Sequence, residues 1–226
     1  NVASANWHAS AALAATVEDS GLLVDVGTTT TDIIPFKDGR ACAVGRNDGD
    51  RLTEGELIYR GVVRTPVMAV AGQAPFRGRM QGLAAERFAT MADVYRLTGE
   101  LPDDADPFAT ADNRSKDLED SAARLARMLG RDADDAYFVA WQALAHFLAR
   151  RLLDQVEADA RAVIEREALN PKAQIVGAGC GRFLAVALAE RLGRPYRDFA
   201  DLIPCSDTAR EMVSRCAPAS AVAQLA

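Results

Sequence analysis

The clearest hydrophobic pattern lies near the start of the chain, where two runs of apolar residues flank a polar turn. The first run ends in Asp25 and Gly27, four threonines follow, and Asp32 opens a second, β-branched run. Asp38-Gly39, a dipeptide typical of tight hairpin turns, separates this run from a third short apolar segment. The pattern therefore predicts an antiparallel meander with strands at about 21–26, 31–36 and 41–45.

Most of the remaining chain has the three- to four-residue spacing of amphipathic helices. A short buried strand at 173–176 precedes a glycine turn and a helix at 182–192, the order of a nucleotide-fold β-turn-α unit. The stretch 134–169 is long enough for two helices or for one continuous helix. Further helices are predicted at 4–19 (capped by Ser4 or Asn6), at 85–97 and at 116–129. The last part of the chain is also predicted to be helical, with an interruption at Pro218. Further strands are predicted at 55–63, 67–71 and 195–199, and loops at 72–82 and 100–115.

Composition and charge restrict the class of protein. The 226 residues are 49% hydrophobic and 26% charged, as expected for a chain that buries a core and stays soluble. A net charge of −6 without a block of like charge argues against a nucleic-acid partner, and no apolar run is long enough to predict a membrane span. Four scattered cysteines, none in a CxxC pair, fit a reducing, cytoplasmic compartment better than a disulfide framework or a structural zinc.

The polar turn has the composition of a phosphate and metal site. Its threonine hydroxyls and backbone N–H groups can donate to phosphate oxygens, and its glycine allows close backbone approach. Its two carboxylates can hold Mg²⁺ through water, and the metal would neutralise charge on a bound phosphate group. A threonine-rich hairpin without a ligand is the competing interpretation, since threonine favours strands. The candidate residues are Asp25, Gly27, Thr28, Thr29, Thr30 and Asp32, with Asp25 as the metal ligand and both aspartates as catalytic candidates.

Three further places carry candidate residues. The Arg64 guanidinium, beside Thr65-Pro66, suits a phosphate or a substrate carboxylate. Asp93, in the next predicted helix, can orient or deprotonate an attacking group, or it is a helical surface acid. The late glycine turn can bring a ligand close to the backbone and to a helix N-terminus, or its glycines are only geometric. Its candidate residues are Gly177, Gly179 and Gly181.

Taken in chain order, these motifs resemble the hydantoinase/oxoprolinase-like branch of the actin/Hsp70/sugar-kinase superfamily. Within that branch the chain is similar to the tetrahydromethanopterin-linked C1-transfer pathway proteins, whose archaeal relatives are methanofuran-precursor synthases. One motif alone would be unspecific, but the ordered set covers most of the chain. The matching segments are 1–7, 25–35, 55–59, 64–67, 86–95 and 177–184.

The resemblance implies an α/β fold: the ribonuclease-H-like second lobe of an actin-like (ASKHA) protein, a β-meander plus helices. A single lobe over 1–226 would carry a helical and loop insertion at about 72–132. In this superfamily the threonine hairpin is one of two phosphate loops. The facing loop, of Asp-x-Gly-Gly type, has no counterpart here, and the chain starts at Asn1 rather than at methionine. We therefore expect a missing N-terminal lobe of the same protein, without which the lone lobe is not a competent enzyme.

The resemblance also implies a transferase of methanofuran- or methylofuran-type C1-carrier biosynthesis. Such an enzyme joins a diphosphate-activated aminomethylfuran to a tyramine-type acceptor and releases pyrophosphate, with Mg²⁺ as the expected cofactor. One alternative is an ATP-dependent small-molecule kinase or hydantoinase/oxoprolinase-like ATPase, so the use of a nucleotide stays open. Another is a non-enzymatic nucleotide-sensing or scaffold lobe that forms a homo-oligomer through the helix at 134–169.

Overall fold

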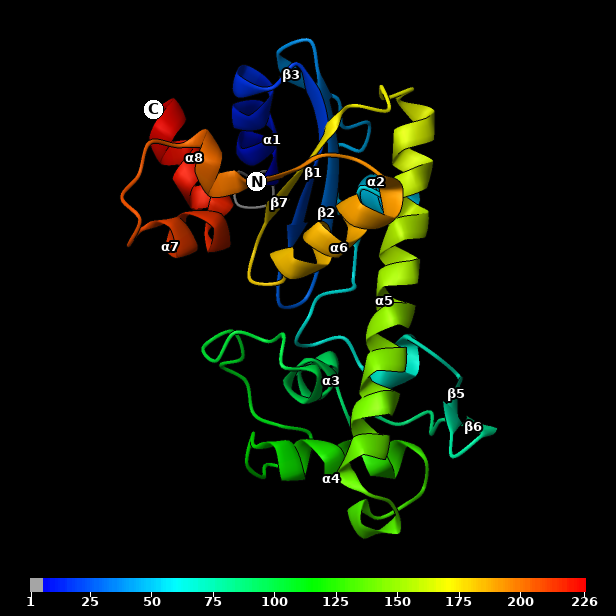
Figure 1. The fold of residues 1–226 in the computed structure, drawn as a ribbon. Coiled ribbons are helices and arrows are strands. Elements are labelled where there is room, and N and C mark those ends of the chain that lie inside the picture. Colours follow the sequence, from blue (N-terminus) through cyan, green and yellow to red (C-terminus); the bar gives the residue numbers. More distant parts are fainter. Residues whose placement is uncertain (1–5) are drawn as a thin grey trace. The chain divides into compact units, whose positions relative to one another are not determined.

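The computed structural model describes residues 6–226 and divides into two compact units (Figure 1). The first unit contains the chain up to Tyr59 together with Val156–Ala226, and the second contains Arg60–Gln155. The predicted helical stretch at 134–169 forms one continuous helix, α5 (Phe138–Arg166), rather than two, and a 3₁₀ turn at Ala133–Asp135 precedes it. The second boundary between the units falls within α5. The predicted cap at Ser4 and most of the motif segment 1–7 lie outside the described residues.

A mixed sheet forms the centre of the first unit. β1 (Ser20–Val26) pairs antiparallel with β2 (Thr31–Lys37) and parallel with β7 (Gln174–Ala178). The strand order is β3-β2-β1-β7-β8, and β4 also pairs with β2. This sheet with its helices confirms the predicted α/β class and the predicted central hairpin. The remaining strands of the sheet are β3 (Arg40–Ala41), β4 (Leu57–Ile58) and β8 (Tyr196–Asp198).

Helices cover this sheet and create its core. Leu23, Ile34 and Val176 share one face because of the strand register, and all three are buried in one cluster with the helices α1 and α8. The helix α6 packs against β1 and β7. The helices of the first unit, apart from its part of α5, are α1 (Asn6–Val17), α2 (Asp48–Thr53), α6 (Arg182–Leu192), α7 (Arg210–Arg215) and α8 (Ala217–Leu225), with a 3₁₀ turn at Phe199–Leu202.

The second unit combines helices with a small hairpin. Its helices α3 and α4 pack against each other, and the indole ring of Trp141 stacks on Phe76 of the hairpin with ring centroids 4.7 Å apart. No helix within residues 6–226 is long and apolar enough to cross a membrane. The elements are β5 (Gln73–Phe76), β6 (Arg79–Gly82), α3 (Met91–Thr98), α4 (Leu118–Met128) and 3₁₀ turns at Val67–Ala69 and Ala133–Asp135.

One predicted strand and one predicted loop of the second unit were wrong, and a predicted strand at the boundary between the units is much shorter than expected. The apolar run at 67–71 forms a 3₁₀ turn after Pro66, because Val70 donates its N–H to the carbonyl of Val67 at 2.9 Å. The predicted strand at 55–63 is reduced to β4, since the Thr65 hydroxyl closes a turn on the carbonyl of Gly61. The predicted loop at 72–82 is the β5–β6 hairpin, whose turn at Arg77 and Gly78 has positive φ values of 49° and 77°.

Three predicted boundaries also moved. The third strand, expected at 41–45, ends at Ala41, because the N–H groups of Val44 and Gly45 donate instead to the buried Glu56 carboxylate at 2.8 and 3.0 Å. The helix expected at 85–97 begins only at Met91, after the cap at Thr90. The last helical stretch is interrupted at Cys216, two residues before the predicted break at Pro218. Pro218 itself lies in the first turn of α8, a position that proline tolerates.

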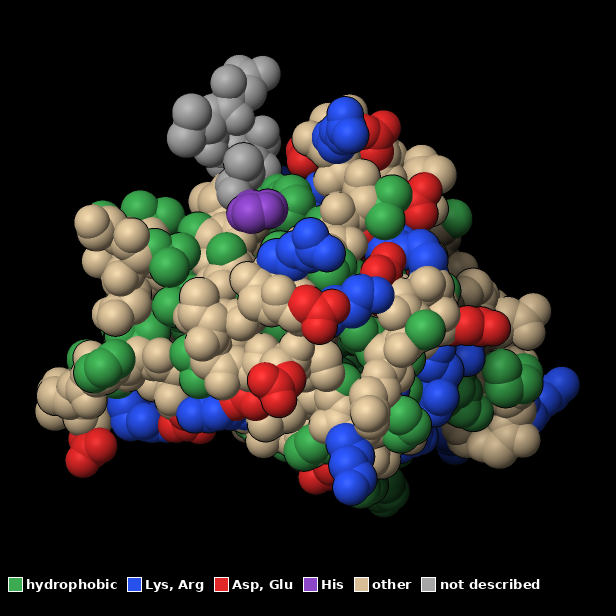
Figure 2. Space-filling view, turned by 90° about the horizontal axis from the view of Figure 1, so that it is seen from above, with side chains coloured by type: hydrophobic (Ala, Val, Ile, Leu, Met, Phe, Trp, Pro, Cys, Tyr) green, Lys and Arg blue, Asp and Glu red, His purple; other side chains and the backbone are tan. Residues whose placement is uncertain are grey.

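Charged side chains of both signs are mixed on the surface. On the face shown in Figure 2, Lys and Arg side chains are interspersed with Asp and Glu side chains. The expected absence of a nucleic-acid partner stays a prediction.

Candidate phosphate and metal site

The threonine hairpin is a closed turn with an acid on each side. Asp25 and Asp32 are directly opposite each other in the β1–β2 register, and the Gly27 N–H donates to the Thr30 carbonyl at 2.9 Å. The hydroxyl oxygens of Thr28 and Thr29 lie 3.4 Å apart, and both side chains are half-buried. The hairpin therefore presents neighbouring hydroxyl groups beside two carboxylates, as the sequence predicted.

The structure brings the late glycine turn next to this hairpin. β7 runs parallel to β1 with Ala178 opposite Asp25, so the chain turns directly beside the hairpin. The Gly181 N–H donates to the Val26 carbonyl at 2.8 Å. Gly179 has a φ of 84°, and a Cβ atom there would lie 2.6 Å from the Asp25 Oδ1 atom. The two turns are thus in direct contact, and that contact requires glycine at position 179.

The glycine N–H groups are largely used within the protein. Those of Gly27 and Gly181 both donate to carbonyls of the threonine hairpin, and that of Gly179 donates to the Ser214 carbonyl at 2.8 Å. At Gly177 the space for a side chain is filled by Tyr196, whose hydroxyl would lie 2.6 Å from a Cβ atom. These contacts favour the geometric interpretation of the glycines and leave the threonines as the available donors.

Arg51 is a member of the site that the sequence analysis missed. Its guanidinium forms an ion pair with Asp32, donates to the Glu56 carbonyl at 3.1 Å and lies 4.0 Å from the centre of the Trp7 ring. The Arg51 side chain is only 2% exposed. Burial raises the pKa of Asp32, whereas the hydrogen bond and charge of Arg51 oppose that rise. The Asp32 carboxylate therefore already has a cationic partner, although no motif around Arg51 indicated it.

Asp25 has no such partner. Among residues 6–226, no hydrogen bond or ion pair reaches its carboxyl group, and burial together with the charge of Asp32 raises the pKa of Asp25 to about 8. The same residues contain no group of three or more His, Cys, Asp or Glu side chains arranged for a metal. Mg²⁺ needs only one or two carboxylates because it keeps several waters. An unpartnered carboxyl beside threonine hydroxyls fits a hydrated magnesium ion that also contacts phosphate.

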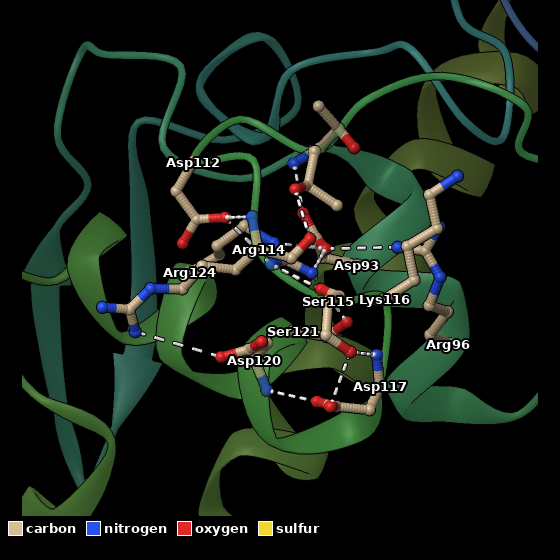
Figure 3. A network of polar contacts seen from close by, with 12 residues as sticks. Asp93, Arg96, Asp112, Arg114, Ser115, Lys116, Asp117, Asp120, Ser121 and Arg124 are labelled. Atoms are coloured by element: carbon tan, nitrogen blue, oxygen red, sulfur yellow. Dashed lines mark hydrogen bonds and ion pairs between the residues drawn. The ribbon is translucent and has the colours of Figure 1, made fainter.

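The other two candidates, Asp93 and Arg64, belong to the second unit. Asp93 accepts from the Thr90 N–H at 3.0 Å and from Arg124 Nε at 2.8 Å, and Arg96 lies 3.3 Å away; Figure 3 shows Asp93 within this network. These are contacts of a buried structural carboxylate, and the proposed proton transfer by Asp93 stays a prediction. Arg64 is exposed, and its guanidinium lies 5.2 Å from the centre of the Phe108 ring.

The network around Asp93 was also absent from the sequence analysis. Arg124, although buried, pairs with both Asp93 and Asp112, and Arg127 pairs with Asp112 as well. Burial alone would raise the pKa of Asp112, but the Arg114 N–H and the charges of Arg124 and Arg127 bring that pKa below its usual value. The ion pairs of the buried Arg124 side chain therefore connect α4 both to α3 and to the loop that precedes α4.

Comparison with known proteins identifies the class of this chain. Residues 1–200 match the hydantoinase/oxoprolinase family, so the chain belongs to that family, as its motifs predicted. All 226 residues are 33% identical to the (4-{4-[2-(gamma-L-glutamylamino)ethyl]phenoxymethyl}furan-2-yl)methanamine synthase of Methanocaldococcus jannaschii, of which they span 65%. A synthase of the same name from Methanococcus vannielii is 32% identical over 116 residues, which are 51% of this chain and 52% of that protein. The predicted similarity to archaeal methanofuran-precursor synthases is thus confirmed.

Proposed function

We propose that this chain belongs to a transferase that forms an aryl ether on a furan and releases pyrophosphate, in the biosynthesis of a methanofuran-type C1 carrier. The observation that carries this proposal is the 33% identity to a synthase across all 226 residues. The printed name of that synthase describes a phenoxymethyl group on a furan, which is an aryl–O–CH₂–furan linkage. The proposal extends this chemistry to the present chain.

We further propose that the first unit is the ribonuclease-H-like second lobe of an actin-like fold. A three-stranded meander that continues through two parallel strands supports this assignment. The threonine hairpin would be one of two phosphate loops, and the facing loop would come from an N-terminal lobe of the same protein. Catalysis then requires both lobes.

In the proposed reaction, the phenol oxygen of the acceptor attacks the methylene carbon of a furanylmethyl diphosphate. A carbon–oxygen bond to the phenol forms and the bond to the diphosphate breaks. Pyrophosphate leaves with the electron pair, and the phenol proton passes to solvent water. The hydroxyls of Thr28, Thr29 and Thr30 would donate to the diphosphate oxygens. Asp25 would hold Mg²⁺, which neutralises charge on the leaving group.

The test is turnover by the full-length protein. Furan diphosphate, γ-glutamyltyramine and Mg²⁺ are incubated with it, and pyrophosphate release and the mass of the ether are measured. We expect both products, with a loss of at least about 100-fold in kcat for Asp25→Asn and none for Asp38→Asn, an exposed aspartate of a neighbouring turn. No pyrophosphate above background, together with ATP hydrolysis, would instead establish the ATPase alternative.

A further inference from the structure

The Arg51 side chain is fixed beside the threonine hairpin by contacts on several sides. Arg51 lies in α2, and its guanidinium donates to the Glu56 carbonyl at 3.1 Å and lies 4.0 Å from the centre of the Trp7 ring. Gly45 leaves room for the aliphatic part of the side chain, because a Cβ atom at Gly45 would lie 2.5 Å from the Arg51 Cγ atom. The guanidinium that pairs with Asp32 is therefore buried in one place, and its charge is held beside the hairpin.

The two carboxylates of the hairpin lie on one face of the sheet. Asp25 and Asp32 are opposite each other in the β1–β2 register, and residues in such positions have Cβ atoms about 4.5–5.5 Å apart. Two carboxyl groups at that spacing can share a single divalent cation. Without Arg51 the hairpin would thus offer two carboxylates to a metal, and the hydroxyls of Thr28 and Thr29 would add further oxygens.

The number of free carboxylates decides which divalent cation such a site prefers. Mg²⁺ keeps several waters and needs only one or two carboxylates, whereas Ca²⁺ takes about six to eight oxygen ligands. The ion pair with Arg51 neutralises Asp32, and the guanidinium repels a metal ion from that carboxylate. Asp25, which has no hydrogen-bond or ion-pair partner within residues 6–226, is then the single available carboxylate.

We propose that Arg51 is a positioning residue that sets the cation preference of the hairpin: it holds Asp32, so that only Asp25 binds the metal, and this favours Mg²⁺ over Ca²⁺. This inference rests on the proposed function, because it takes the hairpin to bind a divalent cation. Arg51 acts through Asp32 and contacts neither the metal nor the diphosphate. Its role is to keep the second carboxylate of the hairpin out of the metal site.

A purely structural role for Arg51 predicts the opposite effect of its replacement. If Arg51 only packed α2 against β4, its loss would loosen the hairpin and weaken the binding of every cation. If Arg51 holds Asp32, its loss releases a second carboxylate, and the affinity should rise more for Ca²⁺ than for Mg²⁺ because Ca²⁺ uses more oxygen ligands. A rise in affinity after the loss of a buried contact therefore distinguishes the two roles.

The experiment measures metal binding without substrates. Calorimetry at one fixed pH titrates the full-length protein with Mg²⁺ alone and with Ca²⁺ alone, for the wild type and for the variants Arg51→Gln, Arg51→Gln/Asp32→Asn and Arg46→Gln. We expect Arg51→Gln to bind Ca²⁺ at least about 10-fold more tightly than the wild type, and Mg²⁺ at most about 3-fold more tightly. The double variant again has one carboxylate, and both of its affinities should lie within about 3-fold of those of the wild type.

Arg46→Gln is the matched control for net charge. Arg46 is exposed in the loop that leads into α2, and its replacement removes the same single positive charge. Solvent and salt screen an exposed charge, so neither metal affinity should change by more than about 2-fold.

Unchanged or weaker Ca²⁺ binding by folded Arg51→Gln would overturn the inference. Loss of Mg²⁺ binding in the double variant would also overturn it, since Asp32 would then be a metal ligand in the wild type. An equal gain in Arg46→Gln would show that net charge alone causes the effect. Arg51→Gln leaves the largely buried Asp32 carboxylate unpaired, and a thermal unfolding curve verifies that it folds. If it does not fold, the double variant, which removes both charges, decides the question through its Mg²⁺ affinity.

The outcomes separate this inference from the proposed reaction. A Ca²⁺ gain in Arg51→Gln that the double variant abolishes, without pyrophosphate release by the wild type, would refute the reaction and leave the role of Arg51 standing. Turnover by the wild type with an unchanged cation preference in Arg51→Gln would do the reverse.

Discussion

Replacement of Asp25 by asparagine is expected to stabilise the protein at neutral pH. Burial of the carboxyl group, with the charge of Asp32 as a second cause, raises the pKa of Asp25 from 3.8 to about 8. Between these pH values the native state keeps a proton that the unfolded chain has lost, so the free energy of unfolding falls as the pH rises through this window. Asparagine has a similar shape and no ionisable group, and Asp25→Asn therefore removes this pH-dependent loss in the free energy of unfolding.

The pKa difference sets the size of this effect. Each pKa unit between the folded and unfolded states corresponds to about 1.36 kcal/mol. Below about pH 4 the side chain is neutral in both states, and the variant and the wild type should have the same free energy of unfolding. The variant should be more stable than the wild type by about 2 kcal/mol at about pH 5 and by about 4 kcal/mol at about pH 7. This difference in the free energy of unfolding should level off above about pH 8.

The assay is urea-induced unfolding of the wild type and the variant at about pH 5 and about pH 7, without magnesium. Asp38→Asn is the control, because Asp38 is exposed in a turn and its change should stay within about 0.5 kcal/mol at both pH values. A variant that is no more stable than the wild type at neutral pH would show that the native Asp25 carboxyl is charged. A gain that is independent of pH would show that packing, rather than ionisation, causes it.

Two further predictions use matched pairs in the same urea assay. Gly179→Ala should lower the free energy of unfolding by about 2–4 kcal/mol, because a φ of 84° and a close carbonyl both oppose a side chain. Gly193→Ala, with a φ of 62° and open space around it, should cost only about 1 kcal/mol, and equal losses would contradict the contact between the two turns. Arg124→Ala should cost about 3–5 kcal/mol, since it leaves the buried carboxylate of Asp93 without its nearest guanidinium. Arg127→Ala, at a more exposed ion pair, should cost at most about 1 kcal/mol; a larger loss than at Arg124 would refute this ranking.

The central hairpin could be predicted because two independent signals agree there. Apolar runs in the sequence indicated β1 and β2, and Asp38-Gly39 indicated the following turn. A similar apolar run at 67–71 led to a wrong strand prediction, because Pro66 precedes the run and local hydrogen bonds close a 3₁₀ turn there. The β5–β6 hairpin was missed because its turn has arginine, rather than asparagine or aspartate, before the glycine.

The site could be predicted only as far as its residues are close in the sequence. The threonine hairpin is one continuous motif, and its contact with the glycine turn follows once β7 is placed beside β1. The partner of Asp32 lies 19 residues away, in a helix without a recognisable motif. Asp93 and Arg124 are 31 residues apart, and periodicity predicts which faces are buried but not which buried charges meet. The contacts that separate structural from functional carboxylates therefore come from tertiary structure.

That separation is the strongest argument for the function of the hairpin. Asp93 and Asp25 are both shielded carboxyl groups, but Asp93 contacts two guanidiniums and a backbone N–H, whereas nothing within residues 6–226 donates to Asp25. A fold that is selected only for stability would replace an unpartnered, desolvated acid, because keeping its carboxyl group protonated at neutral pH costs free energy relative to the unfolded chain. Such a residue is expected where a cation arrives with the ligand, so that the missing partner is supplied only in the bound state. The predicted stability gain of Asp25→Asn and its predicted loss of turnover are thus two consequences of one absent positive charge.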